Sequence, residues 1–341
     1  MHSRFKAAAI HAAPVFLDAT ATTDKAVSLV HEAARAGAAL VAFPETFIPA
    51  FPVWAALAAP IDNHDLFARM ADQSILVDGP EVVRIREAAK AAGIVVSIGI
   101  SERSPVSVGC LWNSNLLIGE DGDILNHHRK LVPTFYEKLI WAAGDGAGLR
   151  VVETAIGRIG QLICGENTNP LARYSLMAQG EQLHISSWPP VWPTRRPAGG
   201  GNYDNLAANR LRAGAHCFEA KVFGLVTASV LDRAAFDTIA ACDPRAAEVL
   251  EGTPRAASFF LDPTGTQIGE ALQEEGILYA EIDLAACIEP KQFHDVVGYY
   301  NRFDVFDLAV NRRRLAPATF RDTASAPPAA AVLTPVPGDG A

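Results

Sequence analysis

The chain has 341 residues, half of them hydrophobic, and a formal net charge of −9. This acidic balance argues against binding to nucleic acid or to an anionic membrane surface, because both need a clustered basic face. The five cysteines are odd in number and scattered, which favours a reducing compartment over a disulfide framework. No apolar run approaches the roughly 20 residues of a membrane span, so we expect a soluble, cytoplasmic protein.

The first third of the chain alternates strand and helix patterns. Residues 5–13 form an apolar run typical of a buried strand, and residues 23–37 carry apolar side chains at helical spacing before a glycine stop. Residues 38–43 predict the next strand, which places Glu45 just beyond a strand end, where α/β folds display functional groups.

The alternation continues to the end of the chain. We expect further strands at 94–100, 115–118, 124–128, 158–163, 184–187, 222–229, 257–261 and 277–282, and helices near 79–91, 169–179 and 204–217. Paired sheets with outer helices would bury these apolar strands, so the sequence predicts an α/β sandwich in αββα layers.

One domain is expected over residues 1–322, because the segments singled out below extend from about 45 to 306 and leave no room for a second module. Residues 323–341 are rich in alanine and proline and carry a single charged residue, Asp339. This composition predicts a disordered tail.

Cys164 ends an apolar strand pattern and precedes Gly165-Glu-Asn, which leads into a helical pattern. A strand end followed by a helix N-terminus is a favourable place for a nucleophilic thiolate. Such a thiol needs a base and a cation. Glu45 lies in the apolar segment Val41–Pro49, which would raise its pKa toward that of a general base, and Lys130 lies in the segment 128–137.

Each of the three has an ordinary alternative. Cys164 could be a small buried hydrophobe, Glu45 a surface carboxylate and Lys130 a solvated lysine beside Arg129. The adjacent His127 and His128 should point in divergent directions, and no metal-ligand spacing or phosphate loop occurs, so the sequence implies neither a metal nor a cofactor.

In order and spacing, these segments resemble the nitrilase (carbon-nitrogen hydrolase) superfamily, whose members carry a Glu-Lys-Cys triad. The resemblance covers roughly residues 5–310 and extends to the segments 131–134, 180–189 and 295–306, which are similar to the nitrilase branch. It implies the αββα fold and a triad of Glu45, Lys130 and Cys164. It also implies that Glu137 is a second glutamate, which holds the lysine and helps to place water.

The implied reaction is hydrolysis of an organic nitrile through a thioimidate and a thioester on Cys164, with the backbone N–H of Gly165 as an oxyanion donor. An amidase or carbamoylase using the same chemistry, or a catalytically silent scaffold, remains open. The resemblance also suggests a homodimer or a larger homo-oligomer. Five side chains are expected around the substrate: Thr134, Tyr136, Trp54, Trp188 and Trp192.

Two positions depart from the family pattern. Gly165 stands where a tryptophan is common, and Tyr299 stands where a histidine often follows the glycine of the late motif. Glycine at 165 should leave space above the thiol. The breaker-rich stretch 189–201 is expected to be a loop over the site or at a subunit contact.

Overall fold

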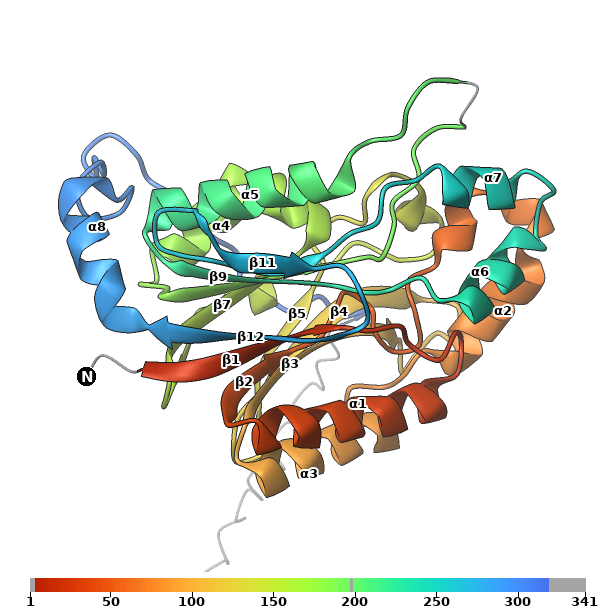
Figure 1. Ribbon diagram of the computed structural model, residues 1–341, viewed down its shortest axis with the longest axis horizontal. Coiled ribbons are helices and arrows are strands. Elements are labelled where there is room, and N and C mark those ends of the chain that lie inside the picture. The colour runs from red at the N-terminus through yellow and green to blue at the C-terminus, as the bar shows by residue number, and fades with distance from the viewer. Residues whose placement is uncertain (1–3, 197–198, 319–341) are drawn as a thin grey trace, which may run out of the picture.

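The computed structural model describes residues 4–196 and 199–318. It contains two six-stranded sheets stacked face to face, with α1 and α3 covering one outer face and α4 and α5 the other (Figure 1). The predicted αββα sandwich is therefore confirmed. The predicted tail at 323–341 lies outside the described residues.

The first sheet has the strand order β12-β1-β2-β3-β4-β5 and the second has the order β11-β10-β9-β8-β7-β6. In the first sheet, β1, β2 and β3 are parallel, whereas β12, β4 and β5 join by antiparallel pairing. Its strands are β1 (Arg4–His11), β2 (Ala38–Ala42), β3 (Val95–Arg103), β4 (Leu111–Ile118), β5 (Ile124–Arg129) and β12 (Gly276–Asp283).

In the second sheet, β7, β8 and β9 are parallel and the outer strands are antiparallel. Its strands are β6 (Val152–Thr154), β7 (Gly157–Ile163), β8 (Leu183–Trp188), β9 (Phe223–Ala228), β10 (Ser258–Leu261) and β11 (Gln267–Leu272). The helices are α1 (Ala19–Arg35), α2 (His64–Gln73), α3 (Pro80–Ala92), α4 (Pro170–Met177), α5 (Asn205–Ala220), α6 (Arg233–Ala240), α7 (Ala246–Glu251) and α8 (Ile288–His294).

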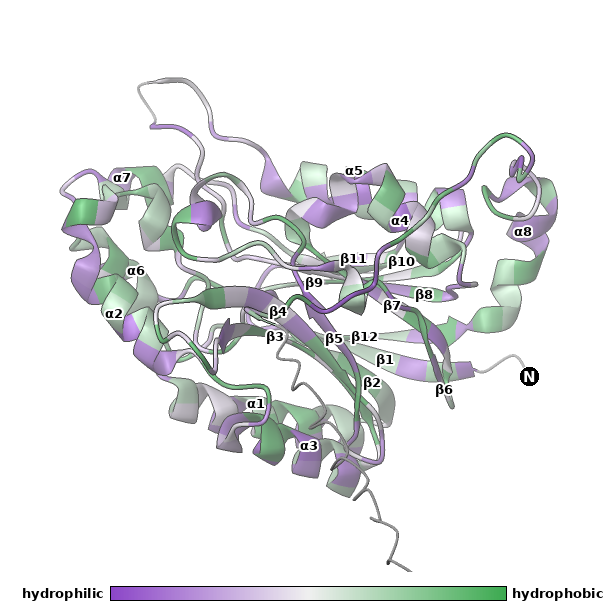
Figure 2. Ribbon diagram, turned by 180° about the vertical axis from the view of Figure 1, so that it is seen from behind, coloured by the Kyte–Doolittle hydropathy of each residue, from purple (hydrophilic) through white to green (hydrophobic). Residues whose placement is uncertain are grey.

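Apolar contacts between the sheets and beneath the helices hold the sandwich together. Between the sheets, small side chains such as Ala7 and Ala9 face Ile185 and Leu225. Below the first sheet, Val30 of α1 and Ile85 of α3 pack into one buried cluster with strand residues. Figure 2 shows hydrophobic and hydrophilic residues alternating along these two helices, as expected for helices with one face on a sheet.

Local caps set where two of the predicted helices begin. Helix α1 begins at Ala19, before the predicted 23, because Asp18 caps it by accepting a hydrogen bond from the N–H of Ala21. The helix predicted near 169–179 is α4, which begins at Pro170 and is capped by Asn169, and residues Cys164–Thr168 before it form a 3₁₀ turn, η5. Within the described residues, no helix is both long and apolar enough to cross a bilayer.

Candidate active site

The three residues of the predicted triad lie at the carboxyl ends of strands. Glu45 follows β2, Lys130 follows β5 and Cys164 follows β7. Strand β5 pairs antiparallel with β4, which pairs antiparallel with β3, so β5 runs in the same direction as β2. Glu45 and Lys130 therefore meet at one edge of the first sheet. The facing edge of the second sheet supplies Cys164.

Lys130 lies between two carboxylates. Its Nζ donates to Glu45 Oε1 at 2.7 Å and to Glu137 Oε2 at 2.6 Å, and all three side chains are buried. A carboxylate oxygen of each glutamate and the Cys164 sulfur lie within 4.8 Å of one another. The alternatives of a surface glutamate and a solvated lysine are thus excluded for Glu45 and Lys130.

Each carboxylate leaves one oxygen open. Glu45 Oε1 also accepts from Asn113 Nδ2 at 2.7 Å, and Glu137 Oε2 also accepts from the N–H of Thr134 at 2.9 Å. Glu45 Oε2 and Glu137 Oε1 are buried and have no hydrogen-bond partner among the described residues. Buried carboxylate oxygens are costly to leave unpaired, so both are available for a proton or a water.

Burial and the neighbouring charges set the pKa values of Glu45 and Lys130. Burial raises the pKa of Glu45 to about 7, although the Lys130 ammonium opposes the rise. Burial acts to lower the pKa of Lys130, but the negative charges of Cys164, Glu137 and Glu45 outweigh it and raise that pKa well above the usual value. Lys130 therefore stays protonated between the two carboxylates.

The buried surroundings of Cys164 favour the protonated thiol over the thiolate. Burial and the Glu45 charge raise the pKa of Cys164 well above its usual value, and Lys130 only partly offsets this. Glu45, Glu137 and Lys130 already sum to one negative charge, so a thiolate would make it two in a buried site. Lys130 thus acts in the expected direction, toward the anion, but burial outweighs it, so Cys164 keeps its proton at rest and needs a base as it attacks.

The nucleophile sits on a strained turn. Cys164 has a φ of +49°, in the left-handed region that ordinary side chains rarely adopt. Glu166 closes this turn, because its carboxylate accepts from the N–H of Ile163 at 2.9 Å and from that of Leu131 at 2.6 Å. One buried carboxylate thus ties the backbone beside Cys164 to the backbone beside Lys130.

The two adjacent histidines diverge as predicted, because successive side chains of a strand point to opposite faces. His128 Nε2 lies 2.8 Å from Glu166 Oε2, behind the site. His127 Nε2 instead lies 2.7 Å from Glu102 Oε2 on the other face of β5.

The predicted substrate-facing side chains gather in two groups. Trp54, Tyr136 and Trp192 belong to one apolar cluster, in which the Tyr136 and Trp192 rings stack with centroids 5.6 Å apart. The Tyr136 hydroxyl is buried near the triad, and its pKa is raised well above the usual value by burial and by the charges of Glu137, Cys164 and Glu45. Trp188 is fully buried at the end of β8, in the same cluster as Cys164.

Sequence reasoning missed four polar residues around the triad. Asn113 holds Glu45, and Glu166 and Asn167 hold the turn at Cys164. Arg212 of α5 is a second cation whose charge acts on the Cys164 thiol, and its guanidinium lies 4.5 Å from the Trp188 ring centroid. The sequence Cys-Gly-Glu-Asn was a signal for Glu166 and Asn167, whereas nothing local marked Asn113 or Arg212.

Gly165 has less room than expected. A Cβ built on it would lie 2.6 Å from Thr134 Oγ1, so the Thr134 hydroxyl already fills the space that glycine leaves. A cavity of about 260 Å³ nevertheless borders Gly165, Thr134 and Glu166. Tyr299, the other departure from the family pattern, is 66% exposed and lies beyond α8.

The close approach of Thr134 Oγ1 to position 165 predicts that substitutions at these two positions have coupled effects on catalysis. Gly165→Ala should lower kcat/KM by an amount equivalent to about 1–3 kcal/mol, because the added methyl group overpacks against Thr134. In a Thr134→Gly background the same change should cost little. Steady-state kinetics of the four proteins of this double-mutant cycle would measure the coupling, and equal losses in both backgrounds would contradict it.

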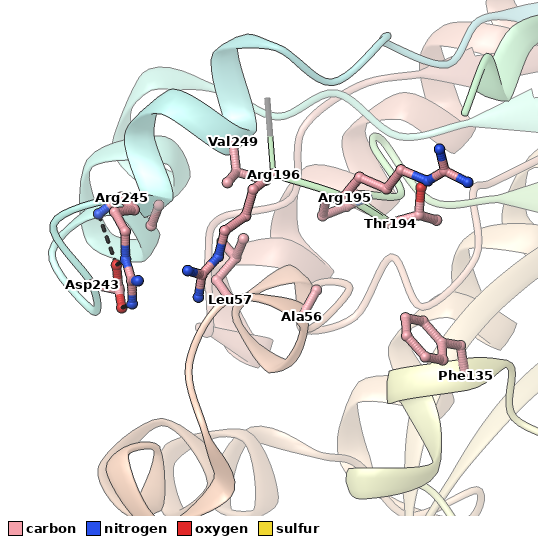
Figure 3. A pocket seen from close by; sticks show the side chains of 11 residues that line it. Ala56, Leu57, Phe135, Thr194, Arg195, Arg196, Asp243, Arg245 and Val249 are labelled. Carbon is pink, nitrogen blue, oxygen red and sulfur yellow. Dashed lines mark hydrogen bonds and ion pairs between the residues drawn. The ribbon is translucent and has the colours of Figure 1, made fainter. Parts of the chain in front are cut away.

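Another pocket, of about 210 Å³, lies between Phe135 and helix α7 (Figure 3). The predicted loop 189–201 contributes Pro193, Thr194, Arg195 and Arg196 to its lining, opposite Leu57 and Phe135. Arg245 on its far side is paired with Asp243, as the dashed line shows. The lining includes none of the triad, so we assign it no part in the chemistry.

Two groups of described residues have the composition of a metal site: Glu45, Glu137 and Cys164, and separately Glu181, His184 and His216. In the first, the Lys130 ammonium already occupies the position between the carboxylates and supplies the positive charge. The second is treated below.

Comparison with known proteins agrees with this geometry. Residues 6–292 match the carbon-nitrogen hydrolase family. A nitrilase from Pseudomonas syringae pv. syringae (strain B728a) is 37% identical, with 91% of each chain covered. A bromoxynil-specific nitrilase from Klebsiella pneumoniae subsp. ozaenae is 38% identical, with 92% of this chain and 87% of the relative covered.

The fold is similar to that of Saccharomyces cerevisiae Nit3, a member of branch 10 of the nitrilase superfamily. The TM-score is 0.67 at 18% identity, and the match covers 89% of this chain and 97% of that one. The family match extends over most of the chain, and the identity to nitrilases exceeds a third. The chain therefore belongs to the carbon-nitrogen hydrolase family, in its nitrilase branch.

Proposed function

We propose that this enzyme is a nitrilase that converts an organic nitrile and two waters to a carboxylic acid and ammonia. The observation that carries the proposal is the convergence of Cys164 with Glu45 and Glu137 within 4.8 Å, around the Lys130 ammonium. A thiol, a base with a pKa near neutrality and a fixed cation are the groups that nucleophilic attack on a polar carbon-nitrogen bond requires.

In the first step, Glu45 Oε2 takes the thiol proton as Cys164 Sγ adds to the nitrile carbon. Proton transfer must accompany attack, because a free thiolate would add a second uncompensated negative charge to the site. Lys130 and the N–H of Gly165 stabilise the charge that develops on nitrogen, and Glu45 returns the thiol proton to that nitrogen, which gives a thioimidate and restores the Glu45 carboxylate.

Water then adds to the thioimidate carbon with Glu45 as base, and ammonia leaves to give a thioester. A second water cleaves the thioester, which releases the acid and restores the thiol. Glu137 holds Lys130 through Oε2, and its open Oε1 can accept a hydrogen bond from the attacking water. If the tetrahedral intermediate expels the thiol instead of ammonia, the product is an amide.

The test is to supply a panel of nitriles and their matching amides side by side and to quantify acid, amide and ammonia. We expect turnover of nitriles with acid as a product. Activity on the amides alone would reject the nitrilase in favour of an amidase or carbamoylase. A complete lack of turnover, with no labelling of Cys164, would favour a silent scaffold.

The pKa of Glu45 predicts the acid side of the pH profile. Because that pKa is raised to about 7, Glu45 is a carboxylate above this pH and a carboxylic acid below it. The base is lost as the pH falls, so kcat/KM should decline below about pH 7, with a limb that belongs to the coupled group of Glu45, Lys130 and Cys164. A profile that stays flat down to pH 5 would contradict this assignment.

We also propose that the enzyme assembles as a homodimer or a larger homo-oligomer. Large apolar side chains are exposed on α4, on α5 and on the segment after α8. Contact of so many apolar side chains with water is unfavourable, so such a surface is typical of an interface between proteins. These side chains are Leu171, Leu211, Phe218, Tyr300, Phe303 and Phe306. Light scattering would measure the mass, and a strictly monomeric species would reject the assembly.

We also propose that the enzyme is located in the cytoplasm. All five cysteines are free in the structure, as expected in a reducing compartment. Cell fractionation would test this location.

A further inference from the structure

A second buried charged cluster lies behind the nucleophile. It consists of Glu181, just before β8, His184 on β8 and His216 on α5, and each side chain is at most 1% exposed. Glu181 Oε1 lies 2.8 Å from His184 Nδ1, and Glu181 Oε2 lies 2.6 Å from His216 Nε2. The mechanism above uses none of these three residues.

Asn167 connects this cluster to the turn that carries the thiol. Its Oδ1 lies 2.8 Å from His184 Nε2, and its Nδ2 donates to the backbone carbonyl of Cys164 at 3.0 Å. The same Nδ2 also lies 3.4 Å from the carbonyl of Leu162. Because Cys164 adopts a φ of +49°, a buried donor on its carbonyl helps to hold a strained conformation.

Counting donors fixes the protonation of His184. Backbone carbonyls only accept hydrogen bonds, so the Asn167 NH₂ group must face Cys164 and its Oδ1 must face His184. His184 Nε2 therefore carries a proton. Its Nδ1 faces a carboxylate, which also only accepts when ionised, so the pair of Glu181 and His184 holds a further proton.

His216 does not compete for that proton. Its Nε2–H donates to Glu181, and its buried Nδ1 has no hydrogen-bond partner among the described residues. Its ring stacks on that of His184 with centroids 3.7 Å apart, where a second cation would be repelled. Burial and the His184 charge lower the pKa of His216 to about 4, so this ring is neutral at physiological pH.

The carboxylate is the weaker base of the Glu181–His184 pair. Burial acts to raise the pKa of Glu181, but the charges and hydrogen bonds of His184 and His216 lower it to about 2. The shared proton therefore belongs on the imidazole ring. The cluster then carries one negative and one positive charge, which sum to zero, as a buried site requires.

A metal ion fits these distances poorly. Bonds of about 2.0–2.2 Å to zinc at a tetrahedral angle keep ligand atoms roughly 3.3 Å apart. The observed 2.6 and 2.8 Å separations between Glu181 and the two rings are those of hydrogen bonds.

We propose that the His184 ring, held between Glu181 and Asn167, carries a proton on each nitrogen, and that its Nε2–H fixes the Asn167 amide so that this amide holds the Cys164 carbonyl and aims the thiol. His184 and Asn167 are thus positioning residues for the reaction. The kinetic part of this inference rests on the proposed function, whereas the protonation part does not.

The first experiment measures the protonation directly, by solid-state ¹⁵N NMR of the full chain labelled at histidine. At pH 7.5, where exposed histidines are largely neutral, we expect one ring with both nitrogens protonated, and its signals should be missing in His184→Gln. A His184 ring protonated only at Nε2 would place the proton on Glu181 and overturn the proposal. Stoichiometric zinc in the purified enzyme would also overturn it.

The second experiment tests the positioning. Asn167→Asp replaces the donor with an acceptor that faces the Cys164 carbonyl, so we expect kcat to fall about a hundredfold with KM little changed. The matched control is Asn169→Asp, which keeps the cap of α4 because aspartate caps as well as asparagine, and it should retain kcat.

These experiments distinguish a failure of the positioning role from a failure of the nitrilase proposal. Wild-type kcat in a folded Asn167→Asp variant would overturn the positioning role, on whichever nitrile or amide the enzyme turns over. If Asn167→Asp does not fold, the NMR measurement on the wild-type chain still decides the charge of His184. Failure of the wild type to hydrolyse any nitrile would reject the nitrilase proposal and leave the NMR prediction standing.

Discussion

Cys164→Ala should lower kcat by a factor on the order of 10⁴ or more, because the variant lacks the atom that forms the covalent intermediate. Glu45, Lys130 and Glu137 would keep their mutual hydrogen bonds, since none of these bonds involves the thiol. The fold should therefore remain, which circular dichroism would show. Ammonia release from a nitrile gives the rate, and mass spectrometry of the quenched protein should detect an acyl adduct only in the wild type.

The matched control for this variant is Cys110→Ala. Cys110 is free and partly exposed, just before β4. It should keep wild-type turnover and adduct formation. Residual activity of Cys164→Ala within tenfold of the wild type, or an adduct on another cysteine, would show that the sulfur at 164 is not the nucleophile.

Lys130→Met should damage both activity and stability. It removes the cation that lies between two buried carboxylates, and an uncompensated buried charge costs about 3–5 kcal/mol. The loss of charge stabilisation in the transition state should lower kcat by a further factor on the order of 10³. Denaturant unfolding and steady-state kinetics would measure the two effects separately.

The stability loss should depend on pH with a definite sign. Burial and the Glu137 charge raise the pKa of Glu45 in the folded state above its unfolded value, and without the ammonium nothing of like strength opposes this rise. The folded protein then binds more protons than the unfolded chain, so stability falls as the pH rises. The deficit of Lys130→Met should be larger at pH 8.5 than at pH 5.5. The exposed control Lys90→Met should show no such trend, and a deficit that does not grow with pH would contradict the charge argument.

Much of the fold was legible in the sequence. The apolar runs that became β1, β2, β3 and β8 are long and bounded by turn residues, so their ends were predicted within about three residues. Strand β11 and helices α2, α6, α7 and α8 were missed, because each has at most ten residues and its burial depends on neighbours distant in the chain. Likewise, the 3₁₀ turn after Cys164 exists because Glu166 bonds back to Ile163 and across to Leu131, contacts that no local pattern reveals.

The sequence by itself determined which residues could perform the chemistry: Glu45, Lys130 and Cys164 stand in motifs whose order and spacing identify them. Only the tertiary structure decided their charges. Burial and the carboxylates around one ammonium raise the pKa of Cys164 well above its usual value, so the thiol keeps its proton until a base removes it. The same holds for His184, whose two ring nitrogens meet acceptors brought from separate segments. Protonation depends on desolvation and on three-dimensional neighbours, and neither is encoded in the spacing of residues along the chain.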